Sequence, residues 1–167
     1  MSRLHIIGLL ILSLIVTGSS ASFAQQSGTS QYKCMIQMTN YMGEKAYVAV
    51  SLMNGKGAYE KTLYVLGSDK KWYPDVKAWY KALGKKTPNI SAISGASVAG
   101  GDRSVIVLDI DNSKLDKDYK LRFESAVEDK EDHAKDIEIP LTTAALSAKS
   151  EGTGFIRYVR FSPNTSN

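Results

Sequence analysis

Cysteine and histidine are scarce in this sequence, and their scarcity excludes several kinds of metal and haem site. Among its 167 residues there are one cysteine, Cys34, and two histidines. A structural zinc site takes four Cys or His ligands, so this set cannot form one. A single cysteine also excludes an intrachain disulfide and the Cys-x-x-Cys-His motif of covalent c-type haem. We expect Cys34 to be a buried thiol, with an intermolecular disulfide as the alternative.

Motifs of several enzyme classes are absent as well. The sequence has no Gly-x-Ser-x-Gly nucleophile elbow, no phosphate-binding P-loop and no paired-carboxylate signature. No nucleophile, base and orienting group can be assembled from it, so a carrier or binding protein is a better hypothesis than a stand-alone enzyme. The net charge is +4, and charges of both signs are interspersed, as in residues 128–132. A nucleic-acid-binding face is therefore not expected.

The apolar run at residues 6–16 is too short to span a membrane, which takes about 20 residues. It follows Arg3 and precedes Ser22-Phe23-Ala24, which places small residues where a signal peptidase needs them. This order predicts a signal peptide over residues 1–24, cleaved after Ala24, and a periplasmic or secreted protein. An uncleaved N-terminal anchor is the alternative. Residues 25–31 are small and polar, and we expect them to form a flexible tail.

Apolar residues alternate with polar ones through most of the remaining chain, which is typical of β-strands. We expect seven strands, over residues 32–39, 47–53, 59–66, 104–110, 119–127, 137–141 and 155–161. The turn Asn54-Gly55-Lys56-Gly57 would join the second and third strands as a hairpin. Short strands separated by turns predict one all-β domain over residues 32–167, an antiparallel β-sandwich of the immunoglobulin-like kind.

The alternation also assigns side chains to the two faces of each strand. Leu121 and Phe123 fall on one face of their strand, and Glu124 falls on the other. Asp136 and Glu138 fall on the solvent face of theirs. We therefore expect Leu121 and Phe123 in the core, and Asp136 and Glu138 in water.

One segment has helical spacing instead. Pro74 suits the first turn of a helix, Val76, Trp79 and Leu83 recur at helical intervals, and Gly84 can close the helix in a left-handed conformation. One short helix over residues 74–83 is the prediction. The neighbouring aromatic residues Trp72 and Trp79 could stack on a flat ring or could pack in the core, and core packing is favoured for Trp79.

The segment after this helix is small and rich in hydroxyl groups, and it contains Ser94-Gly95-Ala96-Ser97. These residues resemble the acceptor motif of extracytoplasmic flavoproteins, Ser/Asp-Gly-Ala/Ser-Thr/Ser, in which a flavin transferase joins FMN by a phosphoester to the last hydroxyl. The resemblance implies Ser97 as acceptor. Gly95 and Ala96 would leave room for the transferase. The alternative is a mobile serine-glycine surface loop.

Two further groups have weaker functional interpretations. His133 lies in the charged stretch of residues 128–136, and we expect it at a solvated hairpin tip rather than in proton transfer. Asp102 and Arg103 could form a pair, or Arg103 could meet a phosphate.

Four blocks of the chain together resemble a bacterial family. They are Tyr47-Val48-Ala49-Val50, residues 71–80 with Trp72-Tyr73-Pro74-Asp75, Ile93-Ser94-Gly95-Ala96-Ser97, and Gly154-Phe155-Ile156. In this order they resemble the predicted periplasmic proteins known as domain of unknown function 2271. Members often have proline after the motif serine, where this chain has Val98.

The resemblance implies a role in flavin electron transfer, because members keep company with membrane PepSY-type reductase proteins and with flavin transferases. Its site would comprise Ser97, Gly95, Ala96, Ser94 and Trp72, with FMN attached to Ser97. The second hypothesis is a non-redox binding or structural β-sandwich module in the periplasm.

Overall fold

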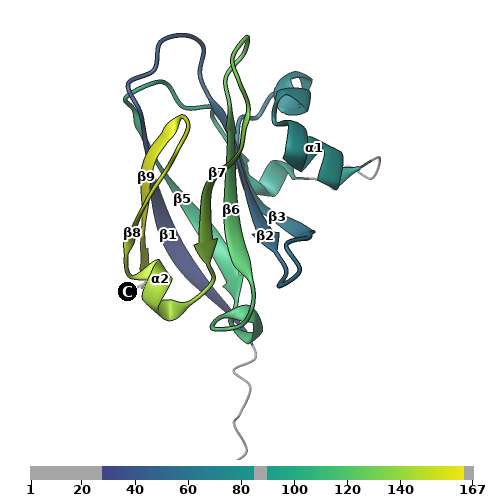
Figure 1. Ribbon diagram of the computed structural model, residues 1–167, viewed down its shortest axis with the longest axis vertical. Coiled ribbons are helices and arrows are strands. Elements are labelled where there is room, and N and C mark those ends of the chain that lie inside the picture. The colour runs from purple at the N-terminus through teal and green to yellow at the C-terminus, as the bar shows by residue number, and fades with distance from the viewer. Residues whose placement is uncertain (1–27, 85–89, 164–167) are drawn as a thin grey trace, which may run out of the picture.

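The computed structural model describes residues 28–84 and 90–163 and consists of two β-sheets packed face to face (Figure 1). The four-stranded sheet has the order β5 (Arg103–Asp111), β1 (Thr29–Met38), β9 (Ile156–Pro163), β8 (Lys149–Glu151). The five-stranded sheet has the order β4 (Ser94–Gly95), β3 (Tyr59–Leu66), β2 (Tyr47–Met53), β6 (Lys120–Ala126), β7 (His133–Pro140). All strand pairs except β3–β4 are antiparallel, which confirms the all-β sandwich.

Each of the seven expected strands is present, and β2 and β3 have the expected bounds. β1 begins at Thr29 rather than at Tyr32, within the segment expected to be a tail. The hairpin turn is confirmed. Asn54 Oδ1 accepts hydrogen bonds from the N–H groups of Lys56 and Ala58, and Gly57 has a φ of 75°. The short strands β4 and β8 were not predicted, because two or three residues carry no readable alternation.

The main core lies between the two sheets. Its fully buried members include Phe123, Leu121, Ile36, Leu108 and Ile156, which come from both sheets. The expectation that Leu121 and Phe123 are core residues is therefore confirmed. Cys34 is also fully buried there, as expected, and burial raises the pKa of its thiol far above the usual range.

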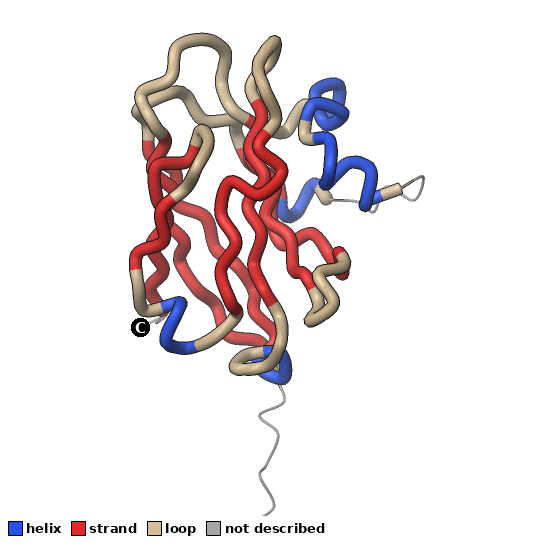
Figure 2. The backbone as a smooth tube through the Cα atoms, in the orientation of Figure 1, coloured by secondary structure: helices blue, strands red, loops and turns tan. Residues whose placement is uncertain are grey.

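A second apolar cluster covers the outer face of the five-stranded sheet, where the helical segment packs (Figure 2). Tyr73, Val76 and Trp79 pack there on strand residues that include Ala49 and Val65. Trp79 is 2% exposed, so its expected core role is confirmed. Its indole Nε1 donates to Thr62 Oγ1 at 2.8 Å, which satisfies the polar end of the ring.

The helical segment is two helices rather than one. The 3₁₀ helix η1 (Lys70–Asp75) contains Pro74, and α1 (Lys77–Leu83) follows after Val76, whose ψ of 73° breaks the helical path. Gly84 ends α1 as expected and has a positive φ of 67°, but its ψ of −164° lies outside the left-handed helical conformation that was predicted. Three further short helices were not predicted: η2 (Ser91–Ile93), η3 (Asn112–Lys114) and α2 (Thr143–Leu146).

Asp136 was predicted to face solvent and is buried instead, and Glu124 is buried as well. Asp136 is 1% exposed and accepts hydrogen bonds from Ser125 Oγ at 2.5 Å and from the N–H groups of Gly154 and Ile156 at 2.7 and 2.9 Å. The β6–β7 register shifts before Ser125, which alternation cannot anticipate. Glu124 is 2% exposed because α1 covers its face of the sheet.

Candidate functional site

The Ser94-Gly95-Ala96-Ser97 segment is hydrogen-bonded on both sides. β4 runs parallel to the end of β3, and Gly95 O accepts the N–H of Gly67 at 2.7 Å. On the other side, Val98 and Ala46 exchange two backbone hydrogen bonds, of 2.7 and 3.1 Å. Ala96 and Ser97 therefore form a short connection between two fixed points.

Tyr41 supports the second of these points. Its hydroxyl donates to Val98 O at 2.8 Å and accepts the N–H of Ala46 at 2.9 Å. Gly100 lies against the Tyr41 backbone so closely that a Cβ would be 2.1 Å from Tyr41 O. Because Val98 N donates to Ala46 O, proline at position 98 would lose a bond that this chain makes.

The two motif serines differ in their hydrogen bonding. Ser94 Oγ donates to the backbone O of Ser91, the first residue of η2, at 3.3 Å. Within residues 28–84 and 90–163, the Ser97 hydroxyl forms no hydrogen bond, and the residue is half-buried beside exposed Ala96. Ser97 is thus the motif serine whose oxygen is not engaged by the fold.

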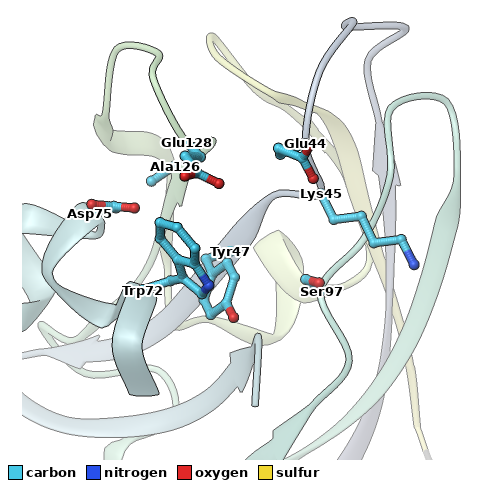
Figure 3. A pocket seen from close by; sticks show the side chains of 8 residues that line it. All are labelled: Glu44, Lys45, Tyr47, Trp72, Asp75, Ser97, Ala126 and Glu128. Atoms are coloured by element: carbon cyan, nitrogen blue, oxygen red, sulfur yellow. The ribbon is translucent and has the colours of Figure 1, made fainter. Parts of the chain in front are cut away.

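Ser97 lines a pocket of about 240 Å³ together with Trp72 (Figure 3). The other lining residues are Glu44, Lys45, Tyr47, Asp75, Ala126 and Glu128. The Trp72 and Tyr47 rings form one side of the pocket, and Ser97 lies across from them. The fold thereby brings together the two residues that sequence reasoning singled out from separate segments, Trp72 and Ser97.

Gly95 and Ala96 line a neighbouring pocket of about 260 Å³, which Ser97 also borders. That pocket lies between β3 and β5 and includes Arg103. The Arg103 Nε donates to Gln37 Oε1 at 3.2 Å. Ser94 is the one predicted site residue that lines neither pocket. Its backbone pairs with β3 as part of β4.

The aromatic side of the first pocket depends on a glycine that sequence reasoning missed. Gly67 has a φ of 125°, and a Cβ there would lie 2.0 Å from the Tyr47 ring. Only glycine lets the ring occupy this position. Burial, then the nearby Asp69 carboxylate, raises the pKa of Tyr47 above its usual range. The Lys71 ammonium lies 4.4 Å from the centroid of the Trp72 ring.

Sequence reasoning also did not identify the charged residues that line this pocket. Glu44, Asp75 and Glu128 contribute carboxylates, and Lys45 contributes the one ammonium among the described lining residues. These residues come from the β1–β2 connection, η1 and the β6–β7 connection. No motif marks them in the sequence, because only the packing of η1 beside β2 and β6 makes them neighbours.

The interpretation of His133 as a solvated hairpin tip is wrong. The residue begins β7 and is half-buried, and its ring packs edge-on against Phe155 with centroids 4.9 Å apart. Gly154 makes this possible, since a Cβ there would lie 2.3 Å from the imidazole. His133 is a packing residue between β7 and the turn that precedes β9.

Comparison with known proteins agrees with the sequence resemblance. Within the described part of the chain no helix is long and apolar enough to cross a membrane, and no cluster of three His, Cys, Asp or Glu side chains could hold a metal ion. No curated protein and no solved structure matches the chain. Residues 29–158 match the family described as predicted periplasmic protein, domain of unknown function 2271. The chain therefore belongs to this periplasmic family.

Proposed function

We propose that this protein carries FMN on Ser97 and transfers electrons in the periplasm. The observation that carries the proposal is the shared pocket of Ser97 and Trp72. A flavin joined to the Ser97 oxygen has an aromatic wall within the same pocket on which its ring can stack. When bound, FMN supplies one- and two-electron chemistry that no side chain here provides.

Ser97 fits the acceptor role by position and by chemistry. Its hydroxyl forms no hydrogen bond within the described residues, and its neighbours Ala96 and Gly95 have little or no side chain. In the attachment the serine oxygen forms a bond to the flavin phosphorus, loses its proton, and displaces AMP from a flavin adenine dinucleotide. A flavin transferase would catalyse this step. Lys45 lines the same pocket as Ser97 and would supply positive charge for the phosphoester.

The proposal also includes export to the periplasm and a redox partner in the membrane. The signal peptide would be cleaved after Ala24, which lies outside the described residues. A membrane PepSY-type reductase would exchange electrons with the carrier, since members of this family keep company with such proteins. N-terminal sequencing of the exported protein should begin at Gln25. A chain that starts at Met1 in the membrane fraction would support an uncleaved anchor instead.

A second candidate function is non-redox binding in the same pocket. It is favoured by the three carboxylates of Glu44, Asp75 and Glu128 beside the Trp72 ring. Carboxylates next to an aromatic face suit a cationic or hydroxyl-rich ligand. Such a protein would bind its ligand without modification of Ser97.

Intact mass and in-gel flavin fluorescence distinguish the two functions. The protein is purified from its native host, or from a periplasmic expression strain with a flavin transferase from that host. Ser97→Ala should abolish the flavin adduct, because a phosphoester needs an aliphatic hydroxyl, and Ser97→Thr should keep it. Ser94→Ala is the matched control and should retain flavin. If wild-type protein from the native host is unmodified, flavin attachment is contradicted and the non-redox binding function is favoured.

A further inference from the structure

Among residues 28–84 and 90–163, the β5 strand is paired along one side of its backbone only. It forms the edge of the four-stranded sheet and pairs with β1 on one side only. Met38 N donates to Asp102 O, and Asn112 N donates to Gly28 O, each at 3.0 Å. Hydrogen-bonded pairs alternate along an antiparallel ladder, so the even-numbered residues of β5 bond to β1. The backbone groups of the odd-numbered residues therefore point to the open edge.

The side chains of β5 do not protect this edge. Val105 and Val107 are 60% and 40% exposed, and both lie on the outer face of the sheet. The nine-residue strand contains no proline, glycine or lysine, the residues that commonly block edge pairing. By contrast, the β7 edge of the other sheet carries Lys135 and ends at Pro140. The middle of β5 is thus an apolar edge, flanked by charged residues, that can accept another strand.

We propose that β5 pairs antiparallel with β5 of a second copy of this chain, with the two-fold axis at Ile106. In this register Arg103 lies opposite Asp109 of the second copy, and Val105 lies opposite its Val107. The pairs join odd-numbered residues, whose backbone groups are the ones that face the edge. Four exposed valines would be covered between two Arg–Asp pairs, and the four-stranded sheets would become continuous.

Charge complementarity favours a second copy as the partner, and the pairing of the valines selects the register. Arg103 lies at one end of β5, and Asp109 and Asp111 lie at the other, so antiparallel pairing of two copies brings opposite charges together. A two-fold axis at Val107 instead would place each Val105 against Asp109 of the second copy. That register would replace the Val–Val pairs with pairs of valine and a carboxylate, which are less favourable. The pairing requires no flavin on Ser97.

Sedimentation equilibrium of the exported wild-type protein tests the interface. We expect a reversible dimer, and we expect Val105→Lys to raise its dissociation constant by at least about tenfold, because each dimer would lose both of its cross-strand Val105–Val107 pairs. Val105 is exposed, so the variant should keep its fold and thermal stability. Ser162→Lys on the interior strand β9 adds the same charge and should leave the dimer unchanged.

Charge exchange tests the register. Arg103→Asp and Asp109→Arg should each weaken the dimer, because each places like charges opposite one another. The double variant restores opposite charges and should bring the dissociation constant back close to the wild-type value. A wild-type protein that stays monomeric at about 500 µM would overturn the proposal. So would a dimer that is insensitive to Val105→Lys, or a double variant no tighter than the single ones.

Discussion

Glu124 accepts the backbone N–H of Trp79 at 2.7 Å and so joins the five-stranded sheet to the first turn of α1. Its other carboxylate oxygen accepts the N–H of Ala78, also at 2.7 Å. The two bonds fix the helix that carries the second apolar cluster, next to η1 with Trp72. An acidic side chain on the face of β6 opposite Phe123 therefore helps to position the pocket.

This relationship predicts that the stability of the protein depends on pH. Burial, then the charge of Asp132, raises the pKa of Glu124 to about 7 from its ordinary value of 4.5. Between these values the folded state binds more protons than the unfolded state, so the free energy of unfolding should fall as pH rises from about 4.5 through about 7. Urea unfolding across this range should show the slope, and Glu124→Gln should remove most of it.

Glu138 on the neighbouring strand provides the control. Burial acts to raise its pKa, but the hydrogen bonds and charge of Arg122 outweigh burial and lower it. Glu138 therefore contributes stability that is lost only as pH falls through the acidic range. Glu138→Gln should leave the slope above pH 4.5 in place. Equal slopes in wild type and Glu124→Gln would contradict the assignment to Glu124.

Trp72 should affect a bound flavin without affecting its attachment. In flavinylated protein, Trp72→Ala should raise the native-state flavin fluorescence severalfold, because stacking on the indole quenches emission. Tyr80→Ala is the matched control, since Tyr80 is 41% exposed on α1 and does not line the pocket. Steady-state fluorescence of native and denatured samples gives the comparison. Equal emission from wild type and Trp72→Ala would show that the ring does not stack there.

A side chain at position 95 should destabilise the fold unless Tyr64 changes too. A Cβ at position 95 would lie 2.8 Å from the Tyr64 hydroxyl, and Gly95 also accepts the hydrogen bond from Gly67 N. Gly95→Ala should lower the free energy of unfolding by about 1–3 kcal/mol. Gly95→Ala/Tyr64→Phe, which removes the hydroxyl, should recover most of this loss. A double variant no more stable than Gly95→Ala would place the strain elsewhere.

The two faces of β6 should respond differently to truncation. Phe123 is fully buried and packs edge-on against Phe161, with centroids 6.4 Å apart. Phe123→Ala should lower the free energy of unfolding by about 3–5 kcal/mol. Lys120→Ala, at an exposed position of the same strand, should change it by less than about 0.5 kcal/mol. Urea unfolding of both variants provides the measurement, and equal losses would contradict the assigned faces.

Local sequence was sufficient for most of the strands. Alternation identified β2 and β3 with their bounds, and Asn54 and Gly57 identified the turn between them. These features depend on residues adjacent in the chain, so their spacing can be read directly. Local spacing also located the helical segment. It did not reveal that Pro74 belongs to a separate 3₁₀ helix, because the break at Val76 accompanies packing on the sheet.

The amino-acid sequence by itself determined that the chain is a β-sandwich of a periplasmic family, and it marked Ser97 and Trp72 as candidates. Only the tertiary structure decided that these two line one pocket with Tyr47 and three carboxylates. It also decided that Asp136 and Glu124 are buried. The physical reason is that pocket membership and burial depend on which elements pack together. That packing joins residues far apart in the chain, and neither the period of a strand nor the spacing of a motif records it.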